Sequence, residues 1–406
     1  MKHSEEGRAL VRQENKQKVT LCMIVKNEAS VILRALKSVE HLVDYYCICD
    51  TGSTDDTPGI IEEYLNSSNL TGIVHNTPWK DFGHNRTECF KLAKKTYKDS
   101  DYLMTLDADE VLVPWKEVPL MDKQLTSFPL LKGDMLYIKT CLGDLSYYRS
   151  GLFKASLDWE WVGVLHEYPY SKQANETNVI ANVCNVPTQD GARSQDPHKY
   201  LNDAKVFEQD LEKDPENGRS WFYLAQSYAD AKKPELAITP IENAIKYSMW
   251  DEEQFTSLLR KARYKLYSGT PFDEVVGDYL AAYQHSPHRS EPLFDIISHY
   301  RRNNKFVSAA LFLEKALAIP YPEDCILFVE SSVYEWRLQD EASLVYHYLG
   351  RSQIAFAIGE LLLTKKGIPE GDMKRIANNI KLFKEAVDAG PMAQPCCGKG
   401  EKSIVL

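Results

Sequence analysis

The amino-acid sequence predicts an α/β domain with a mostly parallel sheet, followed by a domain built only of helices. Between residues 19 and 106, short β-rich apolar runs alternate with amphipathic stretches at helical spacing, which is typical of a parallel sheet covered by helices. Beyond Pro197 the spacing is helical, and one stretch fits a 34-residue helix-pair repeat. The chain has 406 residues, whereas a single core stops growing at roughly 250–300, so two domains are expected.

The first domain is expected over residues 19–195, after a charged and aperiodic extension over residues 1–18 that we expect to be flexible. Its predicted strands cover residues 19–25, 45–49, 72–75, 102–106, 135–140 and 151–154, and its predicted helices residues 29–39 and 84–98. A further helix should follow Asp50, because Pro58 suits a first helical turn. After Asp109 the alternation loosens, so the end of this domain is less regular.

The second domain is expected over residues 196–390 as tetratricopeptide-like helix pairs, with a flexible tail over residues 391–406. The first register comprises Trp221, Leu224, Ala225, Tyr228, Ala237, Ile241 and Ala244, and the second Leu293, Ile296, Ile297, Tyr300, Ala309, Leu313 and Ala316. The registers start 72 residues apart, about two repeats, so a degenerate pair is expected around residues 255–283. An unrelated helical bundle is the alternative, because such residues at helical spacing occur in any α core.

Composition and charge exclude several kinds of partner. Lys and Arg number 48 against 58 Asp and Glu, and the net charge of −10 disfavours nucleic acid. No apolar run approaches the roughly 18–20 residues of a membrane span, and the polar start is unlike a signal peptide, so a cytoplasmic protein is expected. Nine cysteines without CxxC spacing favour reduced thiols over disulfides or a zinc site, and Cys22, Cys47 and Cys49 are expected in the core.

Two carboxylates one residue apart, Asp107 and Asp109, follow the predicted strand 102–106. One such pair is expected by chance, and Asp99 and Asp101 form another, but ligands of open α/β sheets bind beyond the carboxyl ends of strands, where only the first pair lies. In extended backbone both side chains would point to one side and could hold a hard divalent ion. A solvated acidic turn is the alternative.

Asp50 ends a second predicted strand and precedes a helix N-terminus. This position offers a carboxylate and backbone donors to the base and ribose of a nucleotide. Alternatively, Asp50, Ser53 and Asp55 only shape the turn and cap the helix.

Three motifs together resemble the signature series of family 2 glycosyltransferases with the GT-A fold. They are MIVKNE at residues 23–28, CDTGSTDDT at 49–57 and LDADE at 106–110. The resemblance covers about residues 19–195, and a GT-A domain followed by tetratricopeptide-like helices is similar to a known subgroup of bacterial and viral enzymes. It implies sugar transfer from a nucleoside-diphosphate-sugar, usually a uridine or thymidine one and here expected to be a UDP-sugar, to an acceptor hydroxyl with inversion.

The resemblance also implies roles for the donor side of the site. The residues implied to bind the nucleotide-sugar are Glu28, Asp50, Arg86 and Asp107, with Arg86 neutralising phosphate. Asp107 and Asp109 match the D-x-D motif, whose Mn²⁺ or Mg²⁺ bridges the diphosphate, and His166 matches a third metal ligand. Without the resemblance, His166 would be interpreted as a core histidine and Arg86 as part of a surface ion pair.

The catalytic base is not identified by a single motif. The family often places an acidic residue after a Trp in the acceptor half, so Glu160 and Glu167 are the candidates, with Asp158 behind them. Glu110, adjacent to the metal pair, could be structural. The acceptor site could also include Arg193, His198 or Trp221.

The sequence therefore predicts a metal-dependent glycosyltransferase acting on a glycan, protein or lipid acceptor, with helical repeats that could bind a protein partner. The first alternative is an interaction scaffold whose GT-A domain is weak or inactive. The second, nucleotidyl transfer, is disfavoured because Lys26-Asn27-Glu28 stands where a Gly-rich triphosphate loop would follow the first strand.

Overall fold

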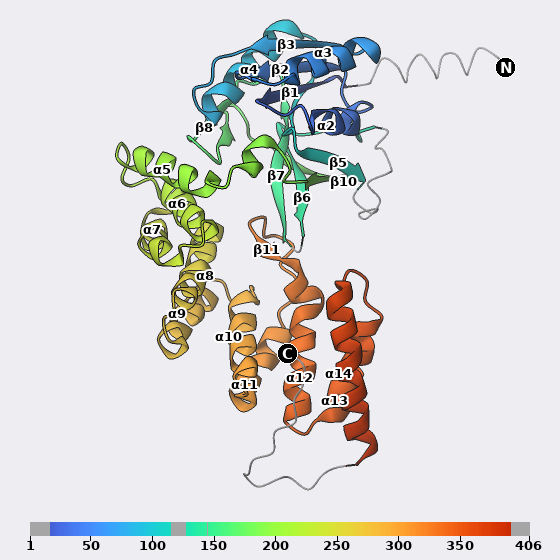
Figure 1. Cartoon of the computed structure of the whole chain (residues 1–406), viewed down its shortest axis with the longest axis vertical. Helices are drawn as coiled ribbons and strands as arrows, with labels where there is room; N and C mark the ends of the chain where they lie inside the picture. The colour runs from blue at the N-terminus through green and yellow to red at the C-terminus, as the bar shows by residue number, and fades with distance from the viewer. Residues whose placement is uncertain (1–16, 115–126, 144, 391–406) are drawn as a thin grey trace, which may run out of the picture. The chain divides into compact units, whose positions relative to one another are not determined.

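The computed structural model describes residues 17–114, 127–143 and 145–390 (Figure 1). Most of the predicted N-terminal extension and the whole predicted tail lie outside the described residues. The chain divides into two compact units after Lys232. The first two long helices after the sheet, α5 (Lys199–Leu211) and α6 (Gly218–Asp230), therefore belong to the first unit.

The first unit is built on a mixed sheet with the strand order β3-β2-β1-β4-β7-β6-β10-β5. The strands are β1 (Val19–Val25), β2 (Tyr45–Asp50), β3 (Thr71–Asn76), β4 (Tyr102–Thr105), β5 (Glu110–Pro114), β6 (Met135–Leu142), β7 (Leu145–Lys154) and β10 (Thr177–Pro187). The run β3-β2-β1-β4 is parallel, and β7 pairs antiparallel with both β4 and β6. The predicted α/β class with a mostly parallel sheet is confirmed for the part that carries the motifs.

Helices cover both faces of the parallel strands. One face packs against α2 (Ile32–Val39) and α3 (Thr57–Ser67), with Leu21 and Ile48 in the shared core. The other packs against α4 (Phe82–Thr96) through Phe90 and a group of cysteines. The first predicted helix begins at residue 32 instead of 29, because the preceding residues form a turn in which main-chain NH groups of residues 31 and 32 donate to the Glu28 carbonyl.

Two strands of the first unit lie outside the main sheet. They are β8 (Glu160–Val162) and β9 (Tyr168–Tyr170), an antiparallel pair from the aromatic-rich segment. A hydrogen bond joins β8 to α4, because the Trp161 NH donates to Thr87 Oγ1 at 2.9 Å. A Cβ at Gly83 would lie 2.7 Å from the Gly163 oxygen and 2.8 Å from the Trp161 oxygen, so only glycine permits this approach.

The second unit contains the part of the predicted all-α domain that follows Lys232, whereas residues 196–232 of that prediction lie in the first unit. Its helices are α7 (Pro234–Tyr247), α8 (Asp251–Tyr267), α9 (Phe272–His285), α10 (Glu291–Arg302), α11 (Phe306–Leu317), α12 (Leu338–Tyr348), α13 (Ser352–Leu363) and α14 (Glu370–Asp388). The predicted repeat positions on α7, α10 and α11 are buried, except the half-buried Tyr300, and α8 and α9 occupy the expected degenerate pair. Within the described residues, no helix has the length and apolarity needed to cross a membrane.

Candidate active site

The loops that follow β1 and β2 are tied together by hydrogen bonds. The Asn27 NH donates to Ser53 Oγ at 2.9 Å, the Thr54 NH donates to Asn27 Oδ1 at 2.7 Å, and the Glu28 NH donates to Thr57 Oγ1 at 2.8 Å. Asn27 has a φ of 59°, a left-handed conformation that asparagine tolerates well. The two loops at the carboxyl ends of adjacent parallel strands are therefore held in one arrangement.

Asp50 is 6% exposed and shapes the turn after β2. Its carboxylate accepts from the Gly52 NH at 3.1 Å, the Ser53 NH at 3.1 Å and Ser53 Oγ at 2.5 Å. Asp55 accepts from the Thr57 NH at 3.1 Å at the start of α3. These contacts favour the turn-shaping interpretation of Asp50, and its role in nucleotide binding stays a prediction.

Asp107 lies in an ion-pair network after β4. Its two oxygens accept from Arg86 Nη2 at 2.6 Å and from Arg149 Nη2 at 3.0 Å. Arg149 Nη1 also donates to Glu110 at 2.6 Å, and Arg86 Nε donates to Glu167 at 2.5 Å. Burial alone would raise the pKa of Asp107, but the charges of Arg86 and Arg149 hold it well below its usual range. Asp107 is thus kept ionised, and Glu110 and Glu167 are joined to it.

Arg86 lies inside the protein, so the surface ion pair considered for it does not form. Its side chain is 7% exposed, and its guanidinium carbon lies 5.4 Å from the centre of the Trp161 ring. The N-terminus of α4 is held by Asp81, whose carboxylate accepts from the His84 NH at 2.7 Å. Nη1 of Arg86 is buried and has no hydrogen-bond partner among the described residues. The Arg86 guanidinium therefore has one nitrogen, Nη1, that could donate a hydrogen bond to a ligand.

Asp109 differs from Asp107 because its carboxylate forms no hydrogen bond or ion pair with the described residues. It lies against Gly191, where a Cβ would be 3.0 Å from Asp109 Oδ2. The nearby Glu28 accepts from the Ala192 NH at 3.1 Å. Burial raises the pKa of Glu28 to about 7, and the charges of Asp109 and Asp107 add to this rise. The three carboxylates are thus close enough to repel, and they are the hard oxygen donors that Mn²⁺ or Mg²⁺ prefers.

His166 packs against α6. It has a φ of 52°, its ring stacks on Tyr223 with centroids 4.1 Å apart, and its carbonyl accepts from Arg219 Nη2 at 2.8 Å. Among the described residues, neither Glu28, Asp107 and Asp109 nor Asp107, Asp109 and His166 form a group whose ligand atoms all lie within 4.8 Å of one another. The role of His166 as a third metal ligand stays a prediction.

The candidate bases lie in different surroundings. Glu167 is 8% exposed at its side chain and paired with Arg86, which joins it to Asp107. Glu160 is exposed on β8, on the opposite face from the buried Trp161. Asp158 is exposed and pairs with Lys94 Nζ at 2.7 Å. The structure therefore brings only Glu167, of these three, into the Asp107 network.

The three residues proposed for the acceptor site lie in different surroundings. Arg193, in a short 3₁₀ turn at Ala192–Gln195, pairs with Asp203 and lies 5.0 Å from the centre of the Phe82 ring at the start of α4. His198 is an exposed residue preceding α5, and the Trp221 indole donates to the Pro215 carbonyl at 2.8 Å. Of the three, Arg193 contacts the start of α4, the helix that carries Arg86.

Sequence reasoning missed Arg149, Arg219 and Tyr223. Arg149 comes from β7, more than 35 residues after Asp107 along the chain, and no local motif marks it. Arg149 lies before the predicted strand 151–154, so no strand pattern marked it as a charge that would require a partner when buried. Arg219 and Tyr223 lie on α6 and contact His166.

Residues 20–121 match the family model described as Glycosyl transferase family 2. The matched part of the chain, which carries the three motifs, is therefore similar to family 2 glycosyltransferases. A TPR repeat-containing protein of Synechococcus elongatus is 34% identical over 153 residues, which are 37% of this chain and 34% of that protein. An uncharacterized glycosyltransferase of Rickettsia felis is 33% identical over 100 residues, 24% of this chain and 30% of that protein. The chain thus spans about a third of the length of these relatives.

Two solved structures show a distant likeness to the chain. TarS 1–349 in complex with UDP is 14% identical with a TM-score of 0.34, over 67% of this chain and 92% of that one. MamA is 12% identical with a TM-score of 0.33, over 46% of this chain and 92% of that one.

Proposed function

We propose that this chain is a metal-dependent glycosyltransferase that moves a sugar from a nucleoside-diphosphate-sugar, in particular a UDP-sugar, to an acceptor hydroxyl with inversion. One observation carries the proposal. In the part of the chain that matches family 2 glycosyltransferases, Glu28, Asp107 and Asp109 follow β1 and β4, and Asp50 is the last residue of β2, so all four stand at the carboxyl ends of neighbouring parallel strands. That edge is where open α/β sheets bind their ligands.

In this proposal the base and ribose are held by the paired loops after β1 and β2. The side chains assigned to them are Glu28 and Asp50. Hydrogen bonds between the loops leave little conformational freedom to lose on binding, which favours affinity. The unpartnered Nη1 of Arg86 is the donor assigned to phosphate, which it would reach after a small opening of the site.

The residues assigned to Mn²⁺ or Mg²⁺ are Asp109 and Asp107, with His166 as a third ligand after movement. The fit rests on Asp109, whose carboxylate forms no ion pair with the described residues. Beside it, burial raises the pKa of Glu28, and the charges of Asp109 and Asp107 add to that rise. Arg86 and Arg149 keep Asp107 ionised and oriented while leaving lone pairs on its oxygens. When bound, such an ion offsets charge on the leaving diphosphate as a Lewis acid.

Inversion requires a carboxylate that accepts the proton of the acceptor hydroxyl. We assign this role first to Glu167 and second to Glu160. Arg86 binds Oε1 of Glu167, and no described residue forms a hydrogen bond with Oε2, so one oxygen remains for the hydroxyl. Glu160 is exposed and lacks this orientation by an arginine.

The test is release of nucleoside diphosphate from a panel of UDP-, dTDP- and GDP-sugars, with Mn²⁺ or with a chelator. We expect turnover of one donor to require metal and to fall at least roughly 100-fold in Asp109→Ala, the scale of losing a charge-stabilising group. Asp99→Asn is the matched control, since Asp99 belongs to the other D-x-D and pairs with Lys18. Unchanged turnover in Asp109→Ala, or with the chelator, would contradict the metal assignment.

We also propose that the helical unit binds a protein partner. Val307 and Leu311 are 70% and 77% exposed and lie one turn apart on the same face of α11. If no nucleotide or nucleotide-sugar raises the thermal midpoint of the folded protein, with or without Mn²⁺, the scaffold function replaces the enzymatic one.

A further inference from the structure

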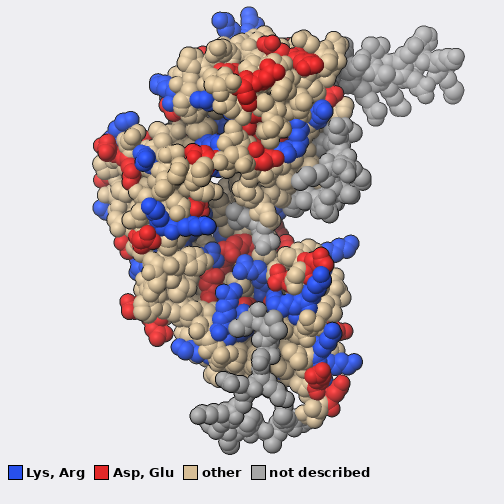
Figure 2. All heavy atoms as spheres, in the orientation of Figure 1, with Lys and Arg blue, Asp and Glu red and all other residues tan. Residues whose placement is uncertain are grey.

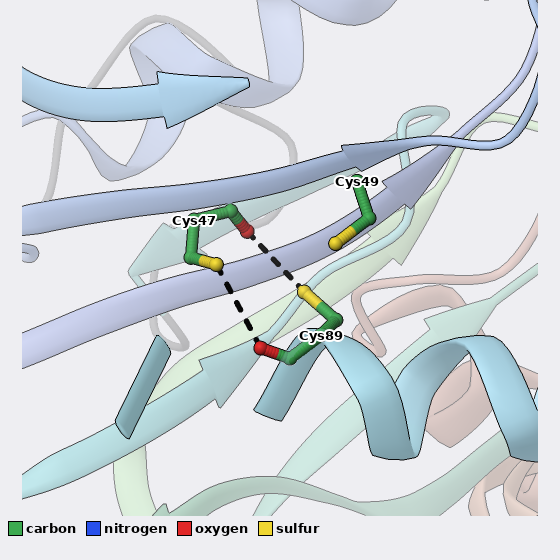
Figure 3. Close-up of side chains that lie close together, drawn as sticks. All are labelled: Cys47, Cys49 and Cys89. Atoms are coloured by element: carbon green, nitrogen blue, oxygen red, sulfur yellow. Dashed lines mark hydrogen bonds between the residues drawn. The ribbon is translucent and has the colours of Figure 1, made fainter. Parts of the chain in front are cut away.

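Three buried cysteines meet between β2 and α4 (Figure 3). Cys47 and Cys49 are two residues apart on β2, so their side chains share the sheet face that α4 covers, and Cys89 lies on α4. Their sulfur atoms all lie within 4.8 Å of one another, and each residue is at most 1% exposed. The sequence predicted that Cys47 and Cys49 are core residues, which accounts for their burial. It does not account for the convergence of three thiols.

The present partners of these thiols are weak. Cys89 Sγ donates to the Cys47 carbonyl at 3.4 Å and Cys47 Sγ donates to the Cys89 carbonyl at 3.7 Å (Figure 3). Thiols are weak hydrogen-bond donors, so exchanging these contacts for metal bonds would lose little. Both carbonyls belong to regular elements that the exchange leaves in place.

A fourth donor stands beside the cluster. His75 on β3 pairs with Cys49 across the parallel strands, so the two side chains project from the same face of the sheet. Its Nε2 is buried and has no hydrogen-bond partner among the described residues. His75 is only half-buried, and β3 is the outermost strand of the parallel run, which provides a path for an ion from the surface.

We propose that Cys47, Cys49 and Cys89 bind one Zn²⁺, with Nε2 of His75 as the fourth ligand. Three cysteines and one histidine form a known class of structural zinc site. Binding forms three Zn–S bonds and one Zn–N bond, releases three thiol protons to solvent and leaves a site of charge −1, with no change of oxidation state. Tetrahedral Zn–S bonds of about 2.3 Å place sulfur atoms about 3.8 Å apart, so the sulfurs need only small shifts. His75 reaches the ion by rotation of its side chain.

The ion would join β2 to α4 behind the proposed donor site. Cys49 precedes Asp50 on β2, and Cys89 is three residues after Arg86 on α4. A structural zinc would therefore fix the two elements that carry these residues. Its binding does not depend on the proposed activity, because no ligand is shared with Asp107, Asp109 or His166.

The experiment uses the full chain, reduced, stripped of metal and reconstituted with Zn²⁺ or Co²⁺. We expect one zinc per chain, sulfur neighbours at about 2.3 Å by X-ray absorption, and thiolate-to-cobalt charge-transfer bands with Co²⁺. Cys49→Ala should weaken zinc affinity by more than the roughly 10- to 100-fold typical of losing an outer-sphere partner, and His75→Gln should weaken it by a smaller factor. Cys325→Ala, outside the cluster, is the matched control and should bind zinc normally.

Two results would overturn the site. The first is wild-type protein without stoichiometric zinc and without charge-transfer bands after reconstitution. The second is a Cys49→Ala variant whose bands and affinity equal those of wild type. If Cys49→Ala does not fold, the wild-type X-ray absorption spectrum decides, because oxygen neighbours in place of sulfur would exclude thiolate ligation.

Discussion

Replacement of Arg86 by Met tests the buried network that positions Asp107. The side chains of Arg86 and Glu167 are 7% and 8% exposed, so Arg86→Met leaves Glu167 as a buried charge without a partner. Breaking a buried ion pair in this way costs about 3–5 kcal/mol. Asp107 contributes less to this loss, because it is 34% exposed and retains Arg149. The expected destabilisation of the first unit is therefore about 3–5 kcal/mol.

The assay is native-state hydrogen exchange of peptides from α4 and β8, because a chain of two compact units need not unfold in one transition. The double variant Arg86→Met/Glu167→Gln should be less destabilised than Arg86→Met alone, since it removes both charges. Arg34→Met is the control, because its pair with Asp190 is 40% and 44% exposed and should be worth at most about 1 kcal/mol. Equal losses in Arg86→Met and Arg34→Met, or no rescue in the double variant, would refute the reasoning.

Two further predictions concern packing. Gly83→Ala should destabilise the first unit by about 1–3 kcal/mol, since its Cβ would lie 2.7 and 2.8 Å from two backbone oxygens. The control is the exposed Gly277→Ala on α9, which should be neutral or stabilising. A comparable loss of stability in both variants would contradict the close approach. Leu313 is 1% exposed, so Leu313→Ala should lower the stability of the helical unit by about 2–5 kcal/mol in denaturant unfolding. Val307→Ala should change that stability by less than about 0.5 kcal/mol. Similar effects of the two substitutions would argue against the repeat register.

Much of the first unit could be predicted from local patterns. The apolar runs that become β1, β2, β3 and β4 agree with the structure within two residues at each end. Most side chains of β1, β2 and β4 are buried, which requires apolar runs that can be found from local spacing. β10 was missed because asparagines interrupt its apolar residues and its register shifts between Ile180 and Cys184. β5 was missed because its first residue, Glu110, is the last residue of the acidic motif, which was not predicted to form a strand.

The surface in Figure 2 shows acidic and basic side chains interspersed over the visible face, which agrees with the modest negative net charge of the sequence. Charge counts could not locate the ion pairs that matter for the site. The partners of Asp107 come from α4 and β7, and Glu167 joins them from the loop before β9. Their association depends on the antiparallel pairing of β7 with β4, which no local spacing encodes.

The sequence by itself determined the alternation of strands and helices, the placement of Asp50, Asp107 and Asp109 at strand ends, and the change to helices near residue 197. These features follow from side-chain periodicity and turn chemistry within a few residues. Only the tertiary structure decided which charges pair with Asp107, that Arg86 is buried, and that Cys47, Cys49 and Cys89 converge. The reason is physical: pairing and burial depend on contacts between segments tens of residues apart, and the same local pattern is compatible with many such contacts.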